Sequence, residues 1–361
     1  MVALHATDPA SVYLSVLARS AATTLTDVAE AMYERRSLVR WMAMRRTLFV
    51  FAREDIPMVQ AAVSTDIAAT LRRRLISQLE RNRSEPPIER DTAEWIADLA
   101  AGVERALTER GAATGTQLAA DQPALRTRIL ARAASERPHN LTTPLLTLMA
   151  ADGRLVRATP TGAWTNRQHR WEPVARWWPE GLPAIDLQQA RRDLARLYLA
   201  RFGPASTDDL RWWTGWNLAT TRRALEHLPI QEVDLHGQPG IDLVGAEREP
   251  AREPVAALLP TLDPTPMGWK NRDWLLGIDA GHIFDRTGNI GPTLWWDGEI
   301  IGSWTIAPDG ELRWKAIADR GAEARGALEQ AASNLHARLH RTVLTPAIRT
   351  PLERSLTAPE Q

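Results

Sequence analysis

The first residues of the chain carry side chains that can hold and activate a water molecule. His5 and Thr7 lie two residues apart, so an extended backbone would direct both side chains to the same side. A neutral His5 can accept a proton from water, with Thr7 as the second hydrogen-bond partner. Asp8 adds a neighbouring carboxylate that can orient His5, although the alternation directs it away from the pair. The alternative is structural, because Thr7, or Asp8 followed by Pro9, can cap a helix that begins at Ala10.

A second set of candidates lies in the segment LVRWMAMRRTLFVFAREDI, residues 38–56. In a strand-like register, Arg40 and Arg46 share one face of this segment. Trp41 and Arg45 then share the opposite face. Arginine side chains at such a place suit contacts with phosphate groups. The alternative is ordinary surface charge that faces a neighbouring glutamate.

Charge and composition restrict the possible partners. The 44 basic and 44 acidic residues cancel, which argues against a general nucleic-acid coat but allows a locally basic face. All basic residues except Lys270 and Lys315 are arginine, which suits bidentate phosphate contacts, although a GC-rich genome would produce the same bias. The 15 tryptophans fit core filling better than stacking on an extruded base.

Several classes of site are disfavoured by composition. The chain has no cysteine, which excludes disulfides and thiolate metal sites. Its eight histidines are scattered and contain no HExxH pattern, so we expect no metal and no cofactor. Without a long apolar run or a targeting segment, the chain is expected to be cytoplasmic and associated with no membrane.

One order of elements recurs along the chain. From residue 206 it reads as two short helices and a hairpin over residues 229–244, with Ser206 and Asn217 as N-caps. Helix, turn, helix and hairpin is the winged-helix arrangement, in which the second helix and the hairpin face DNA. The same order is predicted upstream. In the unit before residue 184, helices are predicted at 92–111, 111–122 and 142–153, followed by a hairpin at 154–171. In the first unit, a helix is predicted at 24–36, followed by a hairpin at 38–52.

The C-terminal part has a different character. Two turn signals, Asp297-Gly298 and Asp309-Gly310, lie between alternating strands and predict a small β-barrel-like module. A solvent-facing helix is expected over residues 320–343, and the last fifteen residues are expected to fray.

The predicted fold class is therefore α+β, mainly helical, with three tandem winged-helix units followed by that β module. The boundaries are 1–90 for the first winged helix, 91–183 for the second, 184–250 for the third and 251–361 for the C-terminal module. Candidate contacts with a nucleic-acid backbone on the second hairpin and on the second helix of the third unit are Arg154, Arg157, Arg167, Arg170, Arg222 and Arg223.

Four segments resemble, in order, those of the AlkZ/YcaQ-like winged-helix DNA glycosylase family. The segment from residue 38 is similar to LVRTWxMRGTLH, with Arg45 at the matching arginine but Arg46 in place of glycine. The others are GPASTDDLRWWTG, LLPTLDPTPMGWKNRD and GNIGPTLWWDGEIIGSW, which are similar to GPxTxxDxxxWxG, LLPxxDxxLxGYxDR and GxxxPxxxxDGxxxGxW. At residues 5–7 the chain has His-Ala-Thr where the family has Gln-x-Gln or Gln-x-Asp.

The resemblance implies excision of N-alkylated purines from duplex DNA, in some members from bulky adducts or interstrand crosslinks. Alkylation at N7 makes the base cationic, so it can leave without a general acid. The protein must then position a water at C1′ and stabilise positive charge on the sugar. In this chain His5 and Thr7 would hold the water, and Asp8 would stabilise the sugar or orient His5. The resemblance also covers four polar residues, which could pair internally and hold the barrel against the third winged helix, a structural role that we favour over catalysis: Asp263, Lys270, Arg272 and Asp273.

The sequence thus predicts a monofunctional DNA glycosylase that acts in repair, as a monomer, on lesion-containing double-stranded DNA near the nucleoid. It would use no metal and no organic cofactor. No lysine occurs between residues 1 and 269, so an N-terminal Schiff-base nucleophile is absent and lyase activity is not expected. The alternatives are a non-catalytic winged-helix DNA-binding protein, regulatory or architectural, and an inactive paralogue.

Overall fold

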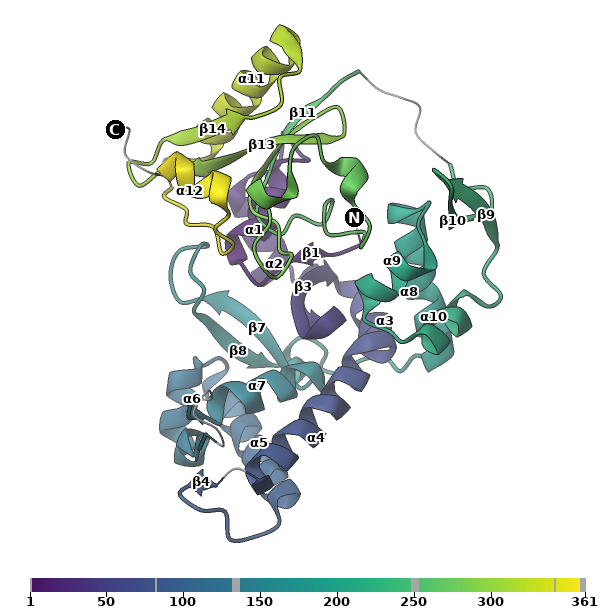
Figure 1. The fold of residues 1–361 in the computed structure, drawn as a ribbon. Coiled ribbons are helices and arrows are strands. Elements are labelled where there is room, and N and C mark those ends of the chain that lie inside the picture. The colour runs from purple at the N-terminus through teal and green to yellow at the C-terminus, as the bar shows by residue number, and fades with distance from the viewer. Residues whose placement is uncertain (1, 82, 132–136, 248–252, 341, 358–361) are drawn as a thin grey trace. The chain divides into compact units, whose positions relative to one another are not determined.

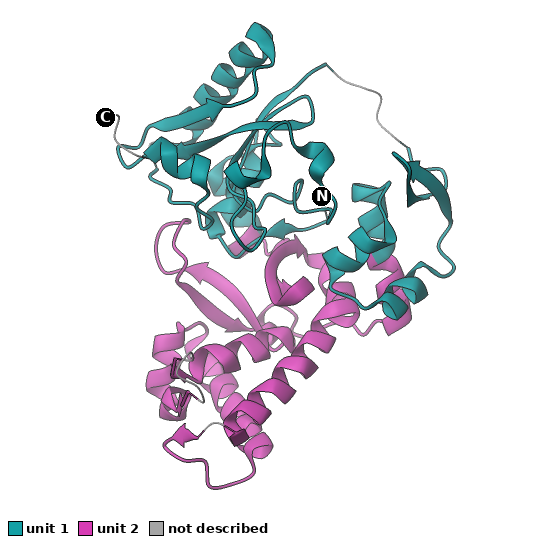
Figure 2. Cartoon of the chain, viewed as in Figure 1, with its two compact units in different colours: residues 1–31, 195–361 teal, residues 32–194 magenta. Residues whose placement is uncertain are grey.

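The computed structural model describes residues 2–81, 83–131, 137–247, 253–340 and 342–357 (Figure 1). Contacts between residues divide the chain into two compact units (Figure 2). Unit 1 comprises residues 1–31 and 195–361, and unit 2 comprises residues 32–194. The four sequence domains stay a prediction, because this division follows contacts and not the repeated order of elements. Among the described residues, no helix combines the length and apolar character that a bilayer-spanning segment requires.

Unit 2 begins with the predicted hairpin. It consists of β2 (Leu38–Ala43) and β3 (Thr47–Ala52), whose side chains are almost all buried on both faces. A three-residue turn joins the strands, and in it Arg45 and Arg46 adopt positive φ values of 54° and 60°. The helices that follow the hairpin are α3 (Ile56–Val59) and α4 (Thr65–Arg81). The helix before it, α2 (Leu25–Tyr33), contains the boundary between the units.

The rest of unit 2 follows the predicted order of three helices and a hairpin. The elements are α5 (Thr92–Arg110), α6 (Gly115–Asp121), α7 (Thr142–Ala151), β7 (Leu155–Pro160) and β8 (His169–Pro173). Asp91 caps α5 through the Glu94 amide, and Thr114 caps α6 in a reciprocal capping box with Gln117. Three two-residue strands, β4 (Ser84–Glu85), β5 (Arg128–Ile129) and β6 (His139–Asn140), form a small antiparallel sheet.

One apolar core supports unit 2. Leucine and alanine side chains at helical spacing on α4, α5 and α7 pack together, and Trp171 of β8 joins them. This core fixes α7 against the β7–β8 hairpin, with which it is in direct contact. The exposed side of α7 is therefore held in a defined place beside the hairpin.

In unit 1, the helix pair and hairpin predicted after residue 206 are confirmed. They are α9 (Thr207–Thr214), α10 (Leu218–Leu225), β9 (Ile230–Leu235) and β10 (Gln238–Leu243). The preceding helix, α8 (Leu187–Phe202), contains the boundary between the units. Ser206 and Asn217 act as N-caps, as predicted, and Asp209 completes a capping box with Ser206. The element order fits a winged helix, and that assignment stays a prediction.

The C-terminal module of unit 1 is an open sheet. Its antiparallel strands are β11 (Ala256–Leu259), β12 (Thr293–Trp296), β13 (Glu299–Ile306) and β14 (Leu312–Ala316), in that spatial order. The two outer strands do not pair with each other, so the described residues form no closed barrel. The remaining elements of unit 1 are β1 (Leu4–His5), α1 (Pro9–Leu17), α11 (Gly321–Leu339) and α12 (Pro351–Thr357).

Two predictions about the C-terminus were wrong. The helix expected to face solvent, α11, buries a stripe that includes Leu328 and Leu335 and contacts β11 and β14. The expected frayed end contains α12, which contacts β13. Glu353 of α12 is fully buried and accepts hydrogen bonds from Thr305 and Arg349. A buried carboxylate with two donors anchors this short helix, and a sequence read for apolar periodicity does not reveal it.

Candidate functional site

The segment before α1 places His5 and Thr7 in different environments. The extended stretch ends at His5, and the chain bends at Thr7 and Asp8 before the helix begins. The alternation that would align the two side chains therefore does not extend to Thr7, which is exposed, whereas His5 is buried. The Thr7 amide instead faces Nδ1 of His5, at a long 3.5 Å. A neutral ring that accepts at Nδ1 carries its proton on Nε2 and is a hydrogen-bond donor there.

Asp8 is held by the C-terminal part of unit 1. Its side chain is 3% exposed, and its Oδ2 accepts a hydrogen bond from the Ala347 amide at 3.1 Å. Although Asp8 occupies the N-cap position of α1, its side chain makes no capping bond to the helix. The carboxylate thus fastens the start of α1 to the segment that precedes α12.

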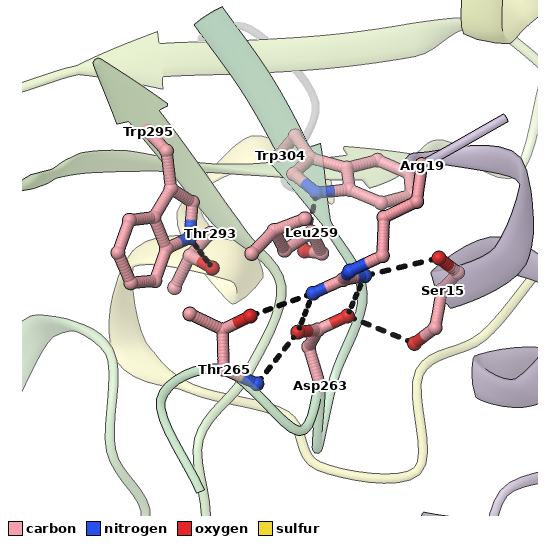
Figure 3. Close-up of polar contacts among 8 residues, drawn as sticks. All are labelled: Ser15, Arg19, Leu259, Asp263, Thr265, Thr293, Trp295 and Trp304. Carbon is pink, nitrogen blue, oxygen red and sulfur yellow. Dashed lines mark hydrogen bonds and ion pairs between the residues drawn. The ribbon is translucent and has the colours of Figure 1, made fainter. Parts of the chain in front are cut away.

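The far end of α1 is fastened more tightly. Asp263 is fully buried, and its carboxylate accepts two hydrogen bonds from Arg19, at 2.8 and 2.7 Å. The Ser15 hydroxyl and the Thr265 amide donate to the same carboxylate, each at 2.9 Å (Figure 3). The Arg338 guanidinium donates to the carbonyl oxygens that follow α1, those of Leu17, Ser20 and Thr23. Asp263 has a structural role, as expected, but the expected pairing was wrong, because its carboxylate holds Ser15 of α1 and the following Arg19.

The four candidate residues of the β2–β3 hairpin differ in exposure, because Arg40 and Trp41 are buried whereas Arg45 and Arg46 are exposed. Trp41 is 1% exposed and donates from Nε1 to Gln60 at 3.0 Å, so it belongs to the core and not to a surface. Arg40 is also buried, at 4% exposure. Arg45 and Arg46 lie exposed in the turn. The strand-register prediction for these two was wrong, because positive φ values reverse the chain before either side chain can continue the alternation.

The arginines of the second hairpin also differ from one another. Arg154 forms a bidentate ion pair with Glu104, at 2.6 and 2.7 Å. This hydrogen-bonded pair raises the pKa of Arg154. The Arg157 guanidinium lies over the Trp171 ring at 5.2 Å. Arg170 donates to the Pro160 carbonyl, and Arg167 is exposed in the connecting loop.

The last two candidates lie on α10. Arg222 and Arg223 are both exposed, and they follow the buried Thr221 on the same helix. Their exposure leaves both side chains accessible to a phosphate group. They keep their role as candidate phosphate contacts.

Two cavities flank α7 within unit 2. One measures about 810 Å³ and is lined by residues of α6, α7 and the β7–β8 hairpin, including Arg126, Arg157 and Arg167. The other measures about 770 Å³ and is lined by α4, α7 and the turn residue Arg46. Thr143 and Thr147 contribute to both cavities. Among the described residues, neither lining contains an aspartate or a glutamate, although the whole chain has equal numbers of acidic and basic residues. The face of α7 therefore suits an anionic polymer.

Comparison with known proteins identifies the family. The family model described as "DNA glycosylase AlkZ-like" matches residues 1–338. The chain belongs to this family. It is thus a DNA glycosylase, a hydrolase of N-glycosyl bonds in DNA. Among solved structures, the DNA glycosylase AlkZ of Streptomyces sahachiroi is similar, with a TM-score of 0.68 and 19% identity over 95% of this chain and 90% of that one. No curated protein matches the chain.

Membership in the AlkZ-like family gives the two parts of the site separate tasks. A DNA glycosylase must bind the backbone of its substrate and must hydrolyse one bond. Sequence reasoning found several arginines for the first task but missed three residues that line the larger cavity, Arg126, His169 and Trp171. They are separated by more than forty positions from one end to the other, so no local motif could have grouped them.

Proposed function

We propose that the protein excises N-alkylated purines from double-stranded DNA by water-mediated hydrolysis of the N-glycosidic bond. The observation that carries this proposal is the fixed placement of His5. It is buried at the end of β1, shortly before α1 begins, with Nδ1 facing the Thr7 amide. The family membership supplies the reaction class, and the cationic character of an N7-alkylated base explains why no general acid is needed.

In this proposal His5 orients the attacking water by a hydrogen bond. This is the role that the glutamines of the family motif would perform, since an amide orients water without being a strong base. The water oxygen bonds to C1′ as the bond from C1′ to the alkylated base breaks, the base leaves with the bonding electron pair, and the water's proton passes to solvent. Thr7, which is exposed and not aligned with His5, contributes its hydroxyl to the sugar. Asp8 has a positioning role. Its carboxylate accepts a hydrogen bond from the Ala347 amide and thereby fixes the start of α1.

Binding to the DNA backbone is assigned to arginines that face solvent or the two cavities. The exposed members are Arg45, Arg46, Arg167, Arg222 and Arg223. Such contacts do not read sequence, which suits an enzyme that must search any duplex for damage. We expect the protein to act as a monomer on lesion-containing DNA, because nothing in this scheme requires a second copy.

The test is release of N7-methylguanine from methylated duplex DNA under single-turnover conditions. We expect His5→Ala to lower the rate by about 10²-fold while DNA binding is retained, because the water loses a positioning group. The matched control is His5→Gln, which restores the residue type of the family motif and should retain most of the rate. Equal rates for wild type and His5→Ala would remove His5 from the mechanism. Absence of release by the wild-type protein would favour the non-catalytic DNA-binding alternative or a different lesion.

A further inference from the structure

Two arginines of unit 2, the buried Arg40 and the half-buried Arg157, have no anionic partner among the described residues. Arg40 is 4% exposed, and in the described part of the chain its Nη2 donates a hydrogen bond to the Tyr33 hydroxyl, at 3.3 Å. Its Nε is buried and has no partner among the described residues. The same is true of Nε of Arg157, whose guanidinium otherwise contacts only the face of Trp171. Neither residue forms an ion pair within the described part of the chain.

These two guanidinium groups also act on each other. Strands β2 and β7, which carry them, are in contact. Burial, and then the charge of Arg40, lower the pKa of Arg157 to about 10, so it is still protonated at neutral pH. His169 beside them is kept neutral, because burial and the same two arginines lower its pKa to about 3. Two like charges in a low-dielectric environment without a counter-ion are costly to the fold.

The cost has a functional explanation, because Arg157 faces the larger cavity beside α7. That cavity of about 810 Å³ is lined by two further arginines, Arg126 and Arg167, and by the hydrogen-bonding side chains of Asn140 and Thr143. None of the described residues that line it is an aspartate or a glutamate. An anion that entered the cavity would meet positive charge and neutral polar groups on these residues.

We propose that Arg157, supported by the charge of Arg40, forms a phosphate-binding site for the DNA backbone. The inference rests on the proposed function for the identity of the ligand as DNA. A phosphodiester fits the site because a guanidinium fork binds two phosphate oxygens at once. Bound DNA would supply the negative charge that the two guanidinium groups lack. In the free protein, the repulsion between Arg40 and Arg157 lowers the stability of the fold.

Arg154 provides a matched contrast in the same hairpin. It lies three residues before Arg157 and has the same side chain, but its guanidinium is saturated by Glu104. Replacement of Arg154 removes a partner from a carboxylate, whereas replacement of Arg157 removes an uncompensated charge. The two substitutions should therefore have opposite effects on stability and different effects on DNA affinity.

The experiment compares Arg157→Met and Arg154→Met in the full chain. Affinity for a lesion-free duplex is measured across a series of salt concentrations, and Tm is measured with and without inorganic phosphate. We expect Arg157→Met to weaken DNA binding about tenfold and to lower the slope of log Kd against log salt by about one. Its Tm should equal or exceed that of the wild type, and phosphate should raise Tm less than in the wild type. Arg154→Met should lower Tm and change the affinity by less than about twofold.

Wild-type affinity and salt slope in Arg157→Met would overturn the proposal. So would a fall in Tm similar to that of Arg154→Met. Arg157→Lys gives a second variant that keeps the charge but loses the planar fork, and we expect it to bind DNA several-fold more weakly than the wild type. These readouts do not depend on base release. Weak binding by Arg157→Met, together with no base release by the wild type, would keep the phosphate site and refute the glycosylase mechanism.

Discussion

The two units use their buried charged groups in opposite ways. In unit 1 the fully buried Asp263 receives hydrogen bonds from the Arg19 guanidinium, the Ser15 hydroxyl and the Thr265 amide. In unit 2 the buried Arg40 and the largely buried Arg157 have no ion pair among the described residues. The Asp263 carboxylate already receives its hydrogen bonds from the protein and needs no ligand. Arg40 and Arg157 have no anionic partner, so a bound anion could supply one.

This difference distinguishes residues that stabilise the fold from residues that bind a ligand. A saturated buried charge contributes to stability only as long as every partner is present, so it indicates a structural joint. An unsaturated buried charge lowers stability in the free protein, so it is retained where a ligand gains from it. On this basis the Asp263 cluster positions α1 and the segment before it, and the arginines of unit 2 bind the substrate.

The largest effect that would test the comparison is the loss of Asp263. We expect Asp263→Ala to lower the free energy of unfolding by about 2–3 kcal/mol, less than for a fully buried pair because the Arg19 side chain is 28% exposed. Urea unfolding measures this change. Ser15→Ala serves as the control, since it removes one donor and should cost only about 1 kcal/mol. Unchanged stability in Asp263→Ala, combined with lost base release, would move Asp263 from the scaffold to the catalytic site.

The sequence predicted local elements well, because their signals are local. The caps at Ser206 and Asn217, the hairpin at residues 38–52 and the order of elements in each predicted unit were read from neighbouring residues and were confirmed. Short polar side chains before a helix satisfy its first amides whatever the rest of the fold does. These features could therefore be assigned without knowledge of tertiary contacts.

The site could be predicted only in part, because its contacts join distant residues. Arg154 and Arg157 look alike in the sequence, and only Glu104, fifty residues away, distinguishes them. The partner of Asp8 is an amide at residue 347, which has no side-chain signal at all. Arg45 and Arg46 were assigned to a strand because their neighbours are apolar, whereas the chain turns there with positive φ values.

A smaller effect is expected from the side-chain N-caps, of which each unit has examples. Ser206→Ala should lower the free energy of unfolding by about 1 kcal/mol, because the Asp209 amide loses its acceptor. Thr114→Ala in unit 2 is the matched substitution, and it should cost about the same. Thermal or urea unfolding measures both. A much larger cost at Ser206 would indicate that Asp209, which also accepts from the Lys270 and Asn271 amides, depends on Ser206 for its orientation.

The smallest effect is expected at the exposed arginines of unit 1. Arg222→Ala should weaken DNA binding by about two- to fivefold, equally for all sequences, and should leave stability unchanged. The effect is smaller than at Arg157 because a guanidinium exposed to water is already solvated and gains less from a phosphate. Arg211→Ala is the control, since that exposed arginine of the adjacent helix α9 is paired with Asp208 at 3.2 Å and should change affinity little. The measurement is the Kd of each variant for duplex DNA across a series of salt concentrations. Arg222→Ala could instead weaken DNA binding as much as Arg157→Met. The lack of an anionic partner at Arg157 would then not identify a stronger phosphate contact, and the proposed difference between the two units would be wrong.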